Sequence, residues 1–205
     1  MSTHHIPGID AEFTATGTVD WAISADRPHI AVTAAPMTDI FVDPNASNPN
    51  PAVLNADTLL MSAPEGDYQL SAKITVGFKS KFDAGVLLVW FNERYWAKFC
   101  FEYNPAGQAT VVSVVNREVS DDSNGVVVDG NTVWMRISRV DNVTCMHSSL
   151  DGEKWDLVRV FDLNYEGELP QIGFEAQSPT GQGCDIEFEE IKFSRTRLAD
   201  QRDGS

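Results

Sequence analysis

The clearest pattern along the chain is an alternation of hydrophobic and polar residues. In residues 68–78, YQLSAKITVGF, one face carries Tyr, Leu, Ala, Ile, Val and Phe, and the other carries Gln, Ser, Lys and Thr. This two-residue period predicts a β-strand with one face in the core and the other in solvent. Further strands are predicted at residues 29–34, 95–103, 109–119, 132–140, 142–150, 155–163, 171–178 and 184–193.

Short turn sequences separate these segments, namely NPAG, DDSNG, VDG, LDGEKW and SPTGQG. Many short strands with such turns, and no helical period, predict an all-β protein that forms a single-domain antiparallel β-sandwich. We expect the domain to cover residues 1–196. Residues 43–52, rich in Pro and Asn, are expected to form a surface loop that borders a binding face, and residues 197–205 a loose polar C-terminal tail.

The predicted strand 95–103, YWAKFCFEY, carries its tryptophan and its charged side chains on one face. Alternation puts Trp96, Lys98, Cys100 and Glu102 on one face and mostly aromatic residues on the opposite face. A tryptophan beside charged groups suits a sugar or polyol, because the indole stacks on C–H groups while the charges bind hydroxyls. The alternative is a solvated outer face that carries an ion pair within the strand.

Neighbouring predicted strands add polar residues to the outward side. Alternation turns Trp134, Arg136, Glu175 and Gln177 away from the core, and His147 follows a weaker pattern. These side chains form one patch with Lys98 and Glu102 only if their strands are adjacent. A lone histidine on a strand is more commonly a hydrogen-bonded structural residue than a base or a ligand.

Composition limits the partners. Thirty acidic residues against fifteen Lys and Arg give a formal net charge of −15, so nucleic acid and membrane surfaces are not expected as partners. Residues 1–13 do not read as a signal peptide, and no apolar run is long enough to span a membrane. Cys100, Cys145 and Cys184 are odd in number and far apart, which favours a reducing, cytoplasmic setting over a disulfide framework.

Several motifs have a functional and a structural interpretation. Residues 185–189, DIEFE, resemble the acidic strand of a retaining glucanase, but the order of Asp and Glu differs; we expect a solvated acidic edge with a bulge near Glu189. The segment 120–125, SDDSNG, could bind calcium, although a turn is commoner. We expect no cofactor, because no glycine loop suits a phosphate, and no metal site.

If the protein catalyses a reaction, Glu102 with Lys98 is the candidate pair, with Asp121 or Glu175 across a groove. Lys and Arg neighbours would lower the pKa of such a carboxylate, which suits a base or an anchor. The residues alone leave open whether the protein is an enzyme.

A set of ordered segments resembles a known family. AGVLLVWFNERYWAKFCFEY, VVSVVNREVSDDSNG, VWMRISR, HSSLDGEKWDLVRVF and IGFEAQSPTGQGCDIEFEEIKF, together with VTAAPMTDIFVDP, are similar to domain-of-unknown-function family 1349, which includes fungal proteins named for regulation of enolase. The resemblance implies a concanavalin A-like lectin/glucanase sandwich, or jelly roll. The residues that match the family's polar positions are Thr38, Asp39, Trp96, Lys98, Glu102, Ser120, Asp121, Arg136, Gln177 and Ser178.

Together these observations predict a protein that binds a carbohydrate or a polyhydroxylated metabolite on a concave sheet face. One alternative is a protein-interaction or regulatory module related to enolase regulation. A second is a glycan-active enzyme that uses Glu102. The fold-level likeness to sugar-binding proteins is an analogy, since function depends on the site rather than on the fold.

Overall fold

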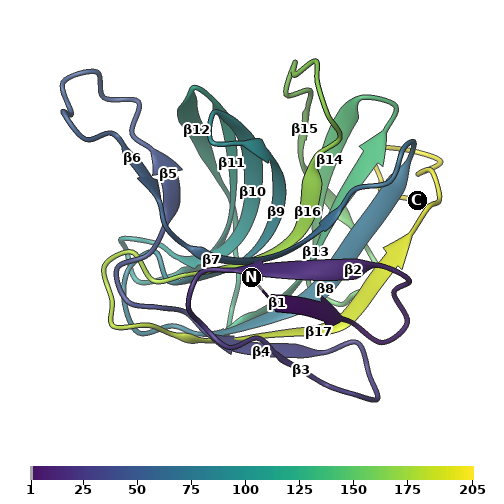
Figure 1. The fold of residues 1–205 in the computed structure, drawn as a ribbon, viewed down its shortest axis with the longest axis horizontal. Coiled ribbons are helices and arrows are strands. Elements are labelled where there is room, and N and C mark those ends of the chain that lie inside the picture. The colour runs from purple at the N-terminus through teal and green to yellow at the C-terminus, as the bar shows by residue number, and fades with distance from the viewer. Residues whose placement is uncertain (1) are drawn as a thin grey trace.

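The protein is a two-layer antiparallel β-sandwich in the computed structural model, which describes residues 2–205 (Figure 1). Every strand pairing in these residues is antiparallel, as the alternating pattern predicts for strands with one buried face. The all-β sandwich prediction is therefore confirmed. No helix in the described part of the chain has the length and apolar character to cross a membrane.

The eight-stranded sheet holds the strands that matter most for the site. Its spatial order is β1 (Ser2–His5), β2 (Glu12–Thr16), β7 (Asp57–Ser62), β16 (Gln171–Gln177), β9 (Ala84–Asn92), β10 (Tyr95–Tyr103), β11 (Ala109–Arg117) and β12 (Val119–Val127). Strands distant in sequence are thus neighbours, because β16 pairs with both β7 and β9.

The seven-stranded sheet forms the second layer. Its order is β15 (Asp156–Phe161), β14 (Val143–Ser149), β13 (Thr132–Val140), β8 (Tyr68–Gly77), β17 (Asp185–Ser194), β4 (Ile30–Thr33) and β3 (Ala22–Ile23). The pairing of β17 with β8 shifts register between Glu189 and Lys192, which confirms the predicted bulge.

A short hairpin completes the fold. Strands β5 (Ile40–Val42) and β6 (Ala52–Leu54) pair only with each other, and the loop that joins them corresponds to the predicted Pro- and Asn-rich segment. In Figure 1 this hairpin stands beside β12, at the edge of the eight-stranded sheet.

Buried hydrophobic residues form two clusters. The larger cluster lies between the sheets and includes Phe99, Phe101, Phe174 and Phe188. The second lies on the outer face of the eight-stranded sheet, the face turned away from the other sheet, and joins residues of that sheet to the β5–β6 hairpin. The hairpin therefore covers part of a face that would otherwise meet water.

The C-terminal segment lies against the sandwich. Leu198 is buried, and the backbone carbonyl of Gly204 accepts a hydrogen bond from Arg136 on β13. Arg197 forms ion pairs with Asp67 and Asp141. Residues 197–205 are polar as expected, but these contacts tie them to the seven-stranded sheet.

Candidate functional site

The predicted polar residues of β10 and β16 meet on the outer face of the eight-stranded sheet. β9 lies between these two strands, and the alternation of each strand turns Lys98, Glu102, Glu175 and Gln177 to the same side. The intervening positions of β9 on this face are small or aliphatic, as with Ala84 opposite Glu102. Long polar side chains can therefore reach across β9 and contact each other.

Lys98 is the centre of this polar group. It is 2% exposed, and its ammonium donates to the carboxylate of Asp39 at 2.7 Å and to the amide oxygen of Gln177 at 2.8 Å. Burial acts to lower the pKa of Lys98, but the nearby carboxylates of Asp39 and Glu175 outweigh it and raise this pKa. The lysine is therefore held as a cation.

The β5–β6 hairpin forms one wall of the site. The Asp39 amide donates to the side-chain oxygen of Asn55 at 3.0 Å, and the hydroxyl of Ser120 on β12 accepts from the amide of Val42 at 2.9 Å. Ser120 also donates to Asn116, so its hydroxyl joins the hairpin to the sheet. Its role is thus to position the wall that carries Asp39 and Phe41.

Thr38 likewise has structural partners. Its hydroxyl donates to the carbonyl of Ala35 at 2.8 Å, and residue 38 forms a β-bridge with Ser178 at the end of β16. Thr38 thus fixes the start of the hairpin, one residue before Asp39.

A loop between β8 and β9 supplies the opposite wall. The carboxylate of Asp83 accepts hydrogen bonds from the amides of Lys79 and Ser80 and from the hydroxyl of Ser178. Phe82, at a φ of 68°, is held in the left-handed region that bulky residues rarely adopt. The backbone carbonyl of Phe82 accepts a hydrogen bond from the side-chain amide nitrogen of Gln177 at 2.9 Å. Strained backbone of this kind is common at binding sites, where surrounding contacts enforce it.

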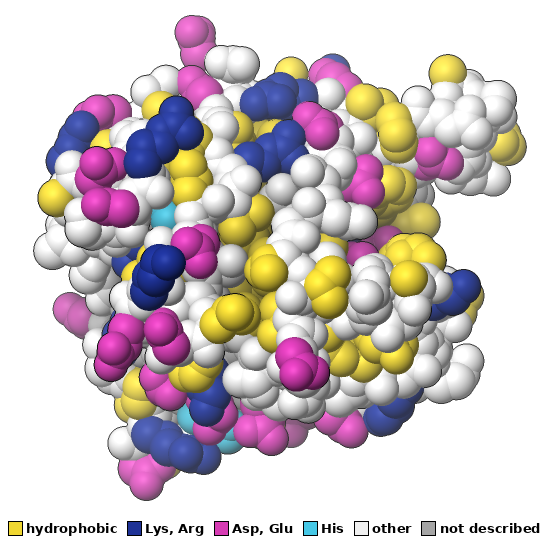
Figure 2. All heavy atoms as spheres, turned by 180° about the vertical axis from the view of Figure 1, so that it is seen from behind, with side chains coloured by type: hydrophobic (Ala, Val, Ile, Leu, Met, Phe, Trp, Pro, Cys, Tyr) yellow, Lys and Arg dark blue, Asp and Glu magenta, His cyan; other side chains and the backbone are white. Residues whose placement is uncertain are grey.

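These elements enclose a cavity of about 270 Å³, called here the outer-face cavity. In Figure 2 the hairpin projects at the upper right, and acidic and hydrophobic side chains gather where it meets the body. The residues that line the cavity are Asp39, Phe41, Phe82, Lys98, Glu102, Val112, Val114, Asp122 and Gln177.

Two glutamates of this face have raised pKa values. Burial is the main cause for both, and it raises the pKa of Glu102 to about 7 and that of Glu175 to about 8, against the opposing effect of Lys98. Glu175 is fully buried, and neither of its carboxyl oxygens has a hydrogen-bond partner among residues 2–205. The expectation that Lys and Arg neighbours lower the pKa of Glu102 is wrong. Desolvation of the Glu102 carboxyl group outweighs the effect of the Lys98 charge. Arg136 has no part in it, because it lies on the seven-stranded sheet.

Trp96 has the predicted direction but is not accessible. It lies on the same face as Lys98, yet it is 0% exposed because the outer hydrophobic cluster, including Ile40 and Val42 of the hairpin, packs with it. Trp96 therefore cannot offer its ring to a ligand in this structure. Phe41 and Phe82, to which the alternating pattern did not point, line the cavity instead.

The predicted polar patch also contains residues that the fold separates. Trp134 and Arg136 lie on β13 and His147 on β14, in the seven-stranded sheet, so they do not share the outer-face cavity. The Arg136 guanidinium stacks on Trp155 at 4.3 Å, and His147 donates to the carbonyl of Gln201 at 3.0 Å. Burial lowers the pKa of His147. The prediction of one common patch is therefore wrong for these three residues.

The segment SDDSNG is a strand rather than a turn. It belongs to β12, an edge strand whose polar residues are largely exposed. Asp121 points away from the cavity and pairs with Arg159 at 2.8 Å, whereas Asp122 lines the cavity. Lys98, Val114 and Asp122 occupy one cross-strand row, which gives them the same face. Alternation within this segment could have identified Asp122, had the segment been assigned to a strand.

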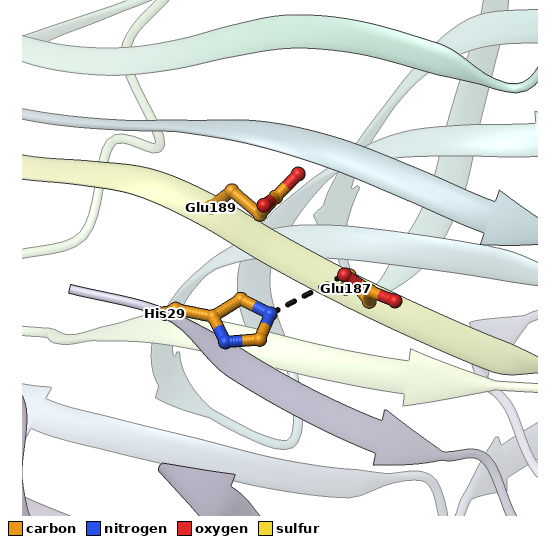
Figure 3. A group of neighbouring side chains, drawn as sticks. All are labelled: His29, Glu187 and Glu189. Carbon is orange, nitrogen blue, oxygen red and sulfur yellow. Dashed lines mark hydrogen bonds and ion pairs between the residues drawn. The ribbon is translucent and has the colours of Figure 1, made fainter. Parts of the chain in front are cut away.

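Acidic residues of β17 lie beside His29, which directly precedes the neighbouring strand β4 of the seven-stranded sheet (Figure 3). Nε2 of His29 lies 3.3 Å from a carboxylate oxygen of Glu187. Glu189 is close enough to share a metal ion with them, but it also contacts Lys73 at 3.6 Å and Arg27 at 4.0 Å. These cations already balance its charge. The acidic side chains of β17 are largely exposed as expected, but β17 lies between β8 and β4, so the expectation of an edge strand is wrong.

The fold and the outer-face cavity define a β-sandwich protein with a cavity beside a hairpin. The family described as "Protein of unknown function (DUF1349)" matches residues 18–196, and the chain belongs to this family. A search of the curated proteins finds no match.

Several solved structures share the fold. A functionally unknown protein from Saccharomyces cerevisiae is 18% identical with a TM-score of 0.78, and the match covers 89% of this chain and 95% of that one. The GH43 BlXynB protein from Bacillus licheniformis is 12% identical with a TM-score of 0.70, and the match covers 92% of this chain and 37% of that protein. Xylan beta-1,4-xylosidase from Bacillus halodurans is 10% identical with a TM-score of 0.67, and the match covers 84% of this chain and 34% of that protein. The chain thus corresponds to about a third of these two enzymes.

Proposed function

We propose that this protein binds a carbohydrate or a related polyhydroxylated metabolite in the outer-face cavity. The observation that carries the proposal is the buried pair Lys98 and Gln177, fixed by hydrogen bonds at the base of a cavity with phenylalanine walls. Small-ligand sites typically combine apolar walls with a few polar groups in fixed positions. A sugar matches this arrangement, since its C–H groups contact aromatic rings and its hydroxyls bind polar groups.

The structural neighbours support this proposal only through their fold. Two are named as GH43 or xylosidase proteins, and both are far below the identity at which a site could be transferred. Three buried free cysteines also support the proposed cytoplasmic setting, since reduced thiols persist there.

A glycan-active enzyme is the second candidate, and the favouring observation is Glu102. A glutamate with a pKa of about 7 holds a proton near neutral pH, which a general acid requires. Glu102 would then protonate a leaving-group oxygen, with Asp122 as the second carboxyl group that lines the cavity. Turnover that is lost in Glu102→Gln would support this candidate, and unchanged turnover in that variant would refute it.

The proposal is tested by thermal shift with a panel of neutral mono- and oligosaccharides and sugar alcohols, including sorbitol. We expect at least one panel member to raise the unfolding midpoint, and we expect Phe41→Ala and Glu102→Gln to weaken its binding several-fold. Glu153→Gln is the matched control, because Glu153 is exposed in the loop between β14 and β15 of the seven-stranded sheet and does not line the cavity. A panel without any response, or a response that the two cavity variants leave unchanged, would refute the proposal.

A further inference from the structure

The side chains that line the outer-face cavity have few hydrogen-bond donors to spare. The Lys98 ammonium has three donors and uses two of them on Asp39 and Gln177. The amide nitrogen of Gln177 donates to the carbonyl of Phe82. One proton of Lys98 and the second N–H of the Gln177 side chain are thus the side-chain donors left for a ligand.

Acceptors, by contrast, are abundant at the same place. No hydrogen bond within residues 2–205 engages the carboxyl groups of Glu102 and Asp122, which both line the cavity. Glu175 adds two unpartnered oxygens on the same face, next to Lys98 and completely buried. Asp122 is exposed and Glu102 is half-buried, so both carboxyl groups are open to a ligand that supplies donors, whereas Glu175 lies beneath the cavity lining.

The charges lead to the same conclusion. Four carboxyl groups, Asp39, Glu102, Asp122 and Glu175, surround the single cation Lys98, and Asp39 already neutralises it. An anionic ligand would meet Asp122 and, above the Glu102 pKa of about 7, the carboxylate of Glu102. A cationic ligand would gain a charge-assisted hydrogen bond to a partly desolvated carboxylate, which is stronger than a neutral one.

The walls are compatible with a cation as well. Phe41 and Phe82 offer aromatic rings, and ammonium groups are attracted to the faces of such rings.

We infer that the ligand of the outer-face cavity carries a protonated amine on a polyhydroxylated skeleton, and that this amine pairs with the carboxylate of Glu102 beside Asp122. This inference rests on the proposed function and narrows it from polyols in general to amino sugars and amino polyols. The hydroxyls of the ligand would accept the free proton of Lys98 and donate to the remaining carboxylate oxygens. Uronic acids, sugar phosphates and other anions would be excluded.

The test compares sorbitol with glucamine, in which an ammonium group replaces one terminal hydroxyl of sorbitol. Affinities are measured by isothermal titration calorimetry at pH 8, above the pKa of Glu102 of about 7, so that its carboxylate is the main form. We expect glucamine to bind at least tenfold more tightly than sorbitol. Glu102→Gln should remove most of this difference and Asp122→Asn part of it, while Glu153→Gln should leave it unchanged.

Three results would overturn the inference. The first is that sorbitol or another neutral panel member binds as well as glucamine, which leaves the proposed function intact. The second is an amine preference that neither Glu102→Gln nor Asp122→Asn reduces, which would indicate general attraction to an acidic protein. The third is stabilisation by calcium chloride alone that depends on Glu102, without an amine preference. If neither the panel nor glucamine binds, the proposed function fails together with the inference.

Discussion

Replacement of Glu175 by glutamine should change how stability depends on pH. Glu175 is fully buried without a hydrogen-bond partner in the described chain, and its pKa rises from the ordinary 4.5 to about 8. An acid whose pKa is raised by folding binds its proton more tightly in the folded state. Stability is therefore lost as the pH rises from about 4.5 to about 8, the range in which the unfolded chain releases the proton first.

The magnitude follows from the size of the pKa change. Each tenfold change in proton affinity corresponds to about 1.4 kcal/mol, so the full effect of ionising Glu175 is on the order of 5 kcal/mol. Glutamine has nearly the same shape as protonated glutamate but cannot ionise. The variant should therefore resemble the wild type at pH 5, within about 1 kcal/mol, and exceed its stability by on the order of 5 kcal/mol at pH 9.

Urea denaturation at pH values from 5 to 9 measures this difference directly. The difference between variant and wild type cancels other titrating groups, since these are common to both proteins. Glu153→Gln provides an exposed control, for which we expect no trend with pH. A difference for Glu175→Gln that stays constant across this range would refute the reasoning, because Glu175 would then be ionised at an ordinary pKa beside Lys98.

Three other predictions concern packing and charge. Lys98→Met should lower the free energy of unfolding by about 3 kcal/mol because it leaves Asp39 without its cation, and a loss below about 1 kcal/mol in urea denaturation would contradict this. Gly85→Ala should cost about 1–3 kcal/mol, since its Cβ would lie 2.7 Å from an isoleucine methyl group in the core; an unchanged thermal midpoint would argue against so tight a contact. Removal of residues 200–205 should raise the pKa of His147 toward its ordinary value by exposing the imidazole, and an NMR titration that finds no change would show that the C-terminal segment does not cover it.

Alternation within single strands correctly predicted which polar side chains of β10 and β16 share a face. It needs only the local geometry of an extended chain, in which neighbouring side chains point to opposite faces. Lys98 and Glu102 share a face of β10, and Glu175 and Gln177 share the same face of β16. The pairing of both strands with β9 makes them one group, and that pairing involves residues far apart in sequence.

Alternation does not reveal which sheet a strand joins, and this explains the misplaced residues. Trp134 and Arg136 do turn away from the core, but β13 belongs to the seven-stranded sheet. The outer faces of the two sheets point in opposite directions. Residues that look equivalent in sequence are therefore separated by the whole thickness of the sandwich.

The hairpin was equally hidden from the sequence, although it determines the chemistry of the site. Ile40 and Val42 cover the outer face near Trp96, and Asp39 beside them reaches Lys98. The same cover that conceals the tryptophan also removes water from the glutamates, which raises their pKa values. A polar sheet face open to solvent would hold ordinary surface charges that bind ligands weakly. Enclosed beside a hairpin, the same residues become a few fixed, partly desolvated groups, and such groups are what selective recognition of a small hydrophilic ligand requires.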